Sequence, residues 1–201
     1  MMTNNYFEYS KFVDVLSFVL STGYHFNFST KAIEKRIIES NYFNKILNDE
    51  KTSDLYKSDI DVVKEIYFDI PEEKINFVTY NEIEWASMVY AYLLDKTNYN
   101  FETILIYLPI QKVYEMFPVY HEMDINKCLT YFNELKQVSI ISKRMKALKL
   151  TNKVLSEQTN LSTSSINFLR NRKTDIRKVA FQNAISLAKA LKISTDTLLN
   201  N

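Results

Sequence analysis

Few side chains of this chain are suited to catalysis or to metal binding. Histidine occurs twice, at positions 25 and 121, and Cys128 is the single cysteine. Three such residues, far apart in the sequence, lack the spacing of a zinc site. Residues 120–124 bring a Tyr, a His and two acids together, but no nucleophile stands beside them. We interpret this segment as the polar end of a helix and predict no enzyme activity, with catalysis around His121 as an alternative.

Glycine and cysteine are both scarce, and this excludes several classes of site. Gly23 is the only glycine, whereas phosphate-binding loops, dinucleotide fingerprints and nucleophile elbows all need glycines. We therefore predict no cofactor. A single cysteine cannot form an internal disulfide, which suits a reducing compartment. No apolar run reaches about 18 residues, so no membrane segment is expected. With no signal-peptide pattern at the start, we predict a cytoplasmic protein.

The charges that could do chemistry are basic, and they gather in the last third of the chain. Residues 136–201 hold 13 Lys and Arg against three acids, a net charge of +10. Residues 1–135 hold 12 Lys and Arg against 21 acids, a net charge of −9. Such a basic domain is typical of a protein that binds a polyanion. The reversal of charge near Lys136 is the best candidate for a domain boundary, giving domains 1–135 and 136–201.

Apolar spacing predicts the elements that must position these charges. Residues 138–149 fit an amphipathic helix, and further helices are predicted from 151, from 162, over 181–191 and from 194 to 199. Thr151, Ser162 and Ser194 are suited to cap the second, third and fifth of them. The residues predicted to face the core from the second and third helices are Val154, Leu155, Ile166 and Leu169.

Two segments of this region resemble the XRE family of lambda-repressor-like helix-turn-helix domains. They are residues 150–171, with the sequence LTNKVLSEQTNLSTSSINFLRN, and residues 187–199, with the sequence LAKALKISTDTLL. The resemblance implies a five-helix domain whose third helix, from Ser162 to about Asn171, lies in the major groove of double-stranded DNA. The side chains implied to contact bases are Thr163, Ser164, Asn167 and Phe168. Those implied to contact phosphates are Asn152, Asn171, Arg172, Lys173, Arg177 and Lys178.

The segment departs from the family pattern at several positions. Asn160 stands where the family favours glycine, and asparagine tolerates the left-handed conformation expected of that turn. Asn152 replaces a common glutamine, and Val154 replaces an acidic residue, so the capping box is missing. The first reading positions carry small hydroxyls. DNA binding is therefore expected to rest more on the basic loop over 170–178 than on base contacts.

The acidic part reads as a bundle of helices. Predicted helices cover 6–22, ended by Gly23, then a stretch from about 29 to 47, and the ranges 58–67, 80–96, 101–108, 110–117 and 124–135. Residues 75–80 are predicted to form a short strand or an extended connector. The predicted fold is mainly α. An acidic helical domain, with or without a small pair of strands, is followed by the five-helix domain.

We predict a DNA-binding transcriptional regulator that acts as a homodimer, because two-fold symmetry doubles what one short helix can read. The N-terminal domain would hold a partner protein or form the dimer. The form we favour is an antitoxin that neutralises a toxin and represses its own operon. The alternative is a protein-interaction inhibitor, for example of a nuclease that carries nucleic acid, in which the helix-turn-helix serves binding or dimerisation.

Overall fold

The computed structural model describes residues 6–47, 57–70 and 80–200 of the chain. These residues form thirteen α-helices and contain no strand, so the prediction of a mainly helical chain is confirmed. The predicted strand over 75–80 lies almost wholly outside the described residues. None of the described helices is long and apolar enough to cross a membrane. The chain divides into two compact units after Tyr131, within a helix and four residues before the change of charge.

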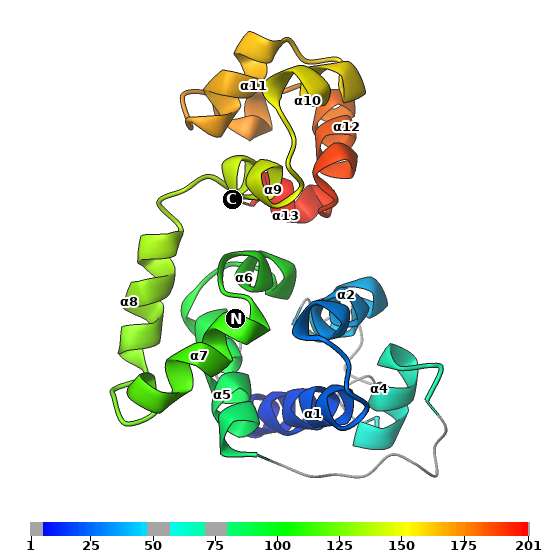
Figure 1. Ribbon diagram of the computed structural model, residues 1–201, viewed down its shortest axis with the longest axis vertical. Helices are drawn as coiled ribbons and strands as arrows, with labels where there is room; N and C mark the ends of the chain where they lie inside the picture. Colours follow the sequence, from blue (N-terminus) through cyan, green and yellow to red (C-terminus); the bar gives the residue numbers. More distant parts are fainter. Residues whose placement is uncertain (1–5, 48–56, 71–79, 201) are drawn as a thin grey trace. The chain divides into compact units, whose positions relative to one another are not determined.

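The first unit is built around two long helices that pack against each other, α1 and α5 (Figure 1). Helix α4 packs on α1 and α2, and α6 and α7 both pack on α5 and α2. The helices are α1 Tyr6–His25, α2 Thr30–Ser40, α3 Tyr42–Leu47, α4 Asp59–Ile66, α5 Asn81–Lys96, α6 Phe101–Tyr107, α7 Ile110–Tyr120 and α8 Asn126–Leu135, which contains the boundary.

Aromatic rings fill the centre of this unit. Phe12, Phe43 and Phe101 come from three different helices and meet edge to face, with ring centroids 5.2 to 6.0 Å apart. Tyr90 meets Phe101 in the same geometry at 5.4 Å. Its buried hydroxyl donates to the Leu108 carbonyl at 2.9 Å, so the polar end of the ring is satisfied. The many aromatic residues thus supply a large buried area from few positions.

Gly23 does not end the first helix, and that prediction is wrong. Helix α1 continues to His25, and Gly23 has a negative φ angle. The left-handed residue comes four positions later, at Asn27, with φ 56°. Gly23 instead allows a close approach of other elements. A Cβ atom added there would lie 2.5 Å from the Tyr67 hydroxyl and 2.6 Å from Cδ1 of Ile33.

Asn41 divides the second predicted helix in two. It adopts a left-handed conformation with φ 53° and separates α2 from α3. Its backbone N–H donates to the Ile38 carbonyl, which ends α2. Asparagine is one of the few side-chain-bearing residues that take this conformation readily.

After the end of α8, the described part of the second unit contains five short α-helices and one 3-10 turn. Helix α10 packs on α11 and α12, and α9 packs on α11 and α12. The α-helices are α9 Ile140–Ala147, α10 Asn152–Gln158, α11 Thr163–Arg170, α12 Phe181–Leu191 and α13 Thr195–Leu199, and the turn is η3 Ile176–Lys178.

Hydroxyl side chains begin four of these helices. Ser139, Thr151, Ser162 and Ser194 each accept a hydrogen bond from a backbone N–H three residues later. These bonds satisfy N–H groups that the helix itself leaves unpaired. The three caps predicted from sequence are therefore confirmed, and Ser139 is a fourth.

Basic residues lie at the C-terminal ends of three of these helices. The left-handed residues that follow α9, α11 and α12 are Lys149, Arg172 and Lys192, with φ 53° to 55°. Arg144 donates to the carbonyls of Leu191 and Lys192 at 3.0 and 3.1 Å. A cation that binds the last carbonyls of a helix is favourably placed in the helix dipole. Arg144 therefore holds α9 to the end of α12.

Candidate nucleic-acid interface

Helix α11 has one buried side and one exposed side. Ile166 and Leu169 are buried and hold the helix against the core. Thr163, Ser164, Asn167 and Phe168 are all exposed. At 3.6 residues per turn these four positions fall within an arc of about 140° around the helix, so their side chains form one broad exposed surface. We call it the α11 stripe.

Two members of the α11 stripe stand out by their chemistry. Phe168 leaves 45% of its surface exposed although it is a large apolar residue beside a packed core. The Asn167 carboxamide oxygen accepts a hydrogen bond from Nδ2 of Asn171 at 3.2 Å. This bond, one helical turn apart, limits the orientations of the Asn167 side chain. The stripe thus presents an apolar ring beside an oriented amide.

The turn between α10 and α11 is held by hydroxyl groups and not by a left-handed residue. Asn160 has a negative φ angle, so the conformation expected of it is wrong. Thr159 is buried, donates to the Leu155 carbonyl at 2.8 Å and accepts from the Leu161 N–H at 3.4 Å. Ser156 donates to the Leu161 carbonyl at 2.8 Å. These side chains fix the turn without glycine.

Asn152 and Arg170 form a pair that connects the start of α10 to the end of α11. Nη1 of Arg170 donates to the Asn152 carboxamide oxygen at 2.6 Å. The Nε atom of Arg170 is buried. The backbone carbonyl of Arg170 accepts a hydrogen bond from the Ser139 hydroxyl at 2.6 Å. Because its oxygen is engaged, the NH2 group of Asn152 is the part of this side chain left to donate to a ligand.

The basic loop after α11 contains two kinds of cation. Arg172 and Arg177 have exposed side chains that are nonetheless bonded: Arg172 donates to the Lys136 carbonyl at 2.9 Å, and Arg177 binds both oxygens of Asp175 at 2.8 to 3.1 Å. Lys173 and Lys178 are exposed, and neither forms an ion pair in the described part of the chain. The two lysines are therefore the cations of this loop most available to a ligand.

These contacts shift the pKa values of their partners. The hydrogen bonds from Arg177 lower the pKa of Asp175 to about 2, so this carboxylate is charged at any ordinary pH. Burial, together with the charge of Arg172, lowers the pKa of Lys136 to about 8. Burial also lowers the pKa of Lys143. The carboxylate of Asp175 therefore offsets part of the positive charge of this loop beside Arg177.

The prediction that Val154 faces the core is wrong, whereas Leu155, Ile166 and Leu169 are buried as predicted. Val154 is 37% exposed on α10, whereas Leu155 is buried. Phe181, at the start of α12, is 69% exposed. The hydroxyl bonds of Ser156 and Thr159 and the amide bond from Asn171 to Asn167 were not anticipated. Their short sequence separations, four or five residues on helices and turns, are the signal that could have suggested them.

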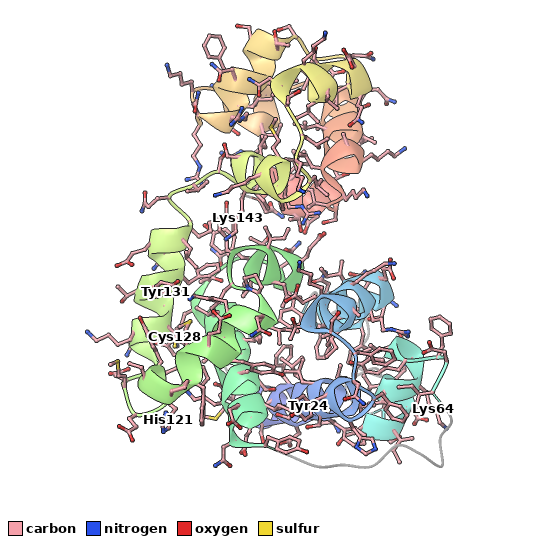
Figure 2. All side chains as sticks on the ribbon, in the orientation of Figure 1. Tyr24, Lys64, His121, Cys128, Tyr131 and Lys143 are labelled. Atoms are coloured by element: carbon pink, nitrogen blue, oxygen red, sulfur yellow. The ribbon has the colours of Figure 1, made fainter. Side chains whose placement is uncertain are left out.

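The polar cluster of residues 120–124 lies in the first unit, at the C-terminal end of α7. Figure 2 shows His121 at the end of α7 and Cys128 on α8. The His121 ring stacks on Phe117 with centroids 4.4 Å apart, and its Nδ1 lies 2.6 Å from the Phe117 carbonyl oxygen. Cys128 is fully buried, and burial raises the pKa of its thiol to about 11. At neutral pH this thiol is protonated and is a poor nucleophile.

Comparison with protein families, curated proteins and solved structures gave no match. The side chains of the α11 stripe, the lysines that follow it and the Asn152–Arg170 pair are therefore the basis on which we argue function.

Proposed function

We propose that residues 132–201 bind double-stranded DNA, with α11 in the major groove. The arrangement of α11 carries this proposal: Ile166 and Leu169 are buried, and the α11 stripe faces solvent. In a helix-turn-helix the second helix of the pair supplies the base contacts in this way. The resemblance of residues 150–171 and 187–199 to lambda-repressor-like domains supports the same assignment.

Contacts to the DNA backbone are assigned to the side chains around both ends of α11. Lys173 and Lys178 follow the helix, are exposed and have no competing ion pair in the described part of the chain. Asn152 and Asn171 supply amide donors, and Arg172 and Arg177 have further N–H groups besides those already bonded. Such contacts position a protein on DNA without reading its sequence. The net charge of +10 over residues 136–201 supports this assignment.

The test compares two pairs of lysines in the full-length protein. Binding to a mixed-sequence duplex is measured by fluorescence anisotropy over a range of salt concentrations. We expect log K to fall with log salt, and the Lys173→Gln/Lys178→Gln variant to reduce the slope by about 0.9 for each phosphate that it no longer neutralises. The control is Lys146→Gln/Lys189→Gln, which removes two exposed lysines from α9 and α12.

Two results would count against this proposal. Absence of salt-dependent binding to any duplex would exclude the function itself. Equal reductions of the slope in the two double variants would show that only the total charge matters, and would exclude the placement of α11 in the groove.

At the level of the whole chain, we propose a transcriptional regulator that works as a homodimer and whose acidic unit holds a partner protein. The net charge of −9 over residues 1–135 supports a partner different from DNA. The specific form we favour is an antitoxin. Co-expression with the protein encoded by the adjacent gene tests it: we expect that protein to be toxic alone and to form a stable complex with this chain. A stable complex without preference for any duplex would favour the interaction inhibitor instead.

A further inference from the structure

The α11 stripe contains no Arg or Lys, the side chains that most often read guanine. Guanine is read in the major groove chiefly by Arg or Lys, which donates to its O6 and N7 acceptors. Thr163, Ser164, Asn167 and Phe168 are all uncharged. The one cation of α11, Arg170, is half-buried and is bound to Asn152 at the start of α10. The strongest kind of guanine contact is therefore missing from the centre of the proposed interface.

Asn167 has the hydrogen-bonding groups that match adenine. Adenine presents its N7 acceptor and its N6 amino donor side by side, and an asparagine carboxamide can bind both. The bond from Asn171 uses one of the two acceptor sites of the Asn167 oxygen. The second acceptor site and both Nδ2 hydrogens are left for a base. Because Asn171 restricts the amide, less conformational entropy is lost when a base binds.

Phe168 adds an apolar contact next to this amide. It is adjacent to Asn167 in the sequence, lies on the same face of α11 and is 45% exposed. Thymine is the only base with a methyl group in the major groove, and apolar side chains contact it there. An amide for adenine and a ring for thymine thus stand side by side.

We infer that the α11 stripe selects A·T base pairs at the centre of each half-site, with Asn167 as the adenine reader and Phe168 as the contact for a thymine methyl. This inference rests on the proposed DNA binding and specifies the sequence class that is bound. Asn171 is a positioning residue, because it acts through Asn167.

The test uses full-length protein and begins with selection of bound duplexes from a randomised pool, which we expect to enrich A·T pairs. The selected duplex is then made in two altered forms. Replacing adenine by 7-deazaadenine removes only the N7 acceptor, and replacing thymine by uracil removes only the methyl group. We expect each replacement, at the pair that is read, to weaken binding by the wild-type protein roughly five- to tenfold.

Variants assign each effect to its side chain. Asn167→Ala should bind the adenine and 7-deazaadenine duplexes equally, and Phe168→Ala should not distinguish thymine from uracil. Asn171→Ala should reduce the discrimination against 7-deazaadenine only in part. Lys173→Gln should weaken binding to every duplex alike. Because all these residues are exposed, the thermal unfolding of each variant should match that of the wild type.

The outcomes distinguish the preference for A·T pairs from DNA binding itself. Enrichment of G·C pairs, or wild-type affinity unchanged by both base replacements, would overturn the assignment to A·T pairs and leave DNA binding intact. Failure to bind any duplex would overturn both.

Discussion

Lys136 is a buried cation near the start of the second unit. Its side chain is 8% exposed, and burial together with the charge of Arg172 lowers its pKa to about 8. In the unfolded chain the Lys136 ammonium group has its ordinary pKa of 10.5. Between these values the unfolded state binds more protons than the folded state. Raising the pH through this window therefore stabilises the fold.

We expect the free energy of unfolding of the wild type to rise between pH 8 and 10 relative to that of Lys136→Met. The difference should grow by up to about 1.4 kcal/mol per pH unit, the limit for one proton. Urea unfolding followed by circular dichroism at several pH values measures it. Lys146→Met, at an exposed position of α9, is the control and should follow the wild type. Parallel curves for wild type and Lys136→Met would show that this lysine titrates normally.

At this scale the sequence indicated which side chains face solvent better than which partners they have. Ile166 and Leu169 face the core, as helical spacing predicted, and the side chains of the α11 stripe are exposed, as the family resemblance implied. The bond between Arg170 and Asn152 joins residues 18 apart, and that between Arg172 and the Lys136 carbonyl joins residues 36 apart. No local pattern signals contacts of that kind, because they depend on how helices pack. Arg172 and Arg177, which the resemblance implied at phosphates, thus also have partners within the chain.

At the scale of the element, Gly23 shows how packing can reverse an intrinsic preference. Alanine favours an α-helix over glycine by about 1 kcal/mol, so Gly23→Ala within α1 would be stabilising in isolation. In this fold the new methyl group would meet Tyr67 and Ile33. Tyr67 is held in place by its hydrogen bond to the Val19 carbonyl at 2.9 Å and by stacking on Phe28.

We expect Gly23→Ala to lower the free energy of unfolding by about 1–3 kcal/mol, the usual cost of overpacking. Thermal and chemical unfolding of the full-length protein measure this. The double variant Gly23→Ala/Tyr67→Phe removes the hydroxyl nearest the new methyl group and should be destabilised by less than the sum of the two single variants. A more stable Gly23→Ala protein would show that helix propensity prevails and that the neighbours adjust.

Helix starts were more predictable than helix ends. Thr151, Ser162 and Ser194 begin helices where the sequence placed caps, because a hydroxyl and the N–H groups that it binds are only three residues apart. The ends depend on which residue turns left-handed. Asn27, Asn41 and Lys192 do so, and Gly23 and Asn160 do not. Tertiary contacts decide among several residues that are all capable of it.

At the scale of the whole molecule, the two units differ in charge more than in architecture. Both are helical, and their opposite charges could be read directly from the sequence. The partner of the acidic unit could not be predicted from the sequence. The aromatic residues of that unit are largely buried in the core, and buried side chains do not indicate what binds at the surface. The aromatic centre around Phe12, Phe43 and Phe101 is part of this core.

For the homodimer we expect two chains to bind one duplex that carries two inverted half-sites. Their centres should lie about 10 base pairs, or a multiple of this, apart, so that both recognition helices meet the same side of the DNA. Sedimentation of the complex gives the stoichiometry. Scrambling one half-site should weaken binding at least tenfold, because the second α11 then contributes only backbone contacts. One chain per duplex, with equal affinity for a single half-site, would contradict the dimer.

The left-handed cations that follow α9, α11 and α12 set stability and charge against each other at single positions. A side-chain-bearing residue in this conformation is strained by roughly 1–2 kcal/mol, whereas glycine is not. Selection for thermal tolerance would therefore favour glycine at Lys149 and Lys192, whereas glycine at Arg172 would also lose the bond to the Lys136 carbonyl. Each of the two favoured changes would also remove one positive charge from a unit proposed to attract a polyanion. Heat resistance and affinity for nucleic acid would then evolve in opposite directions at these two codons.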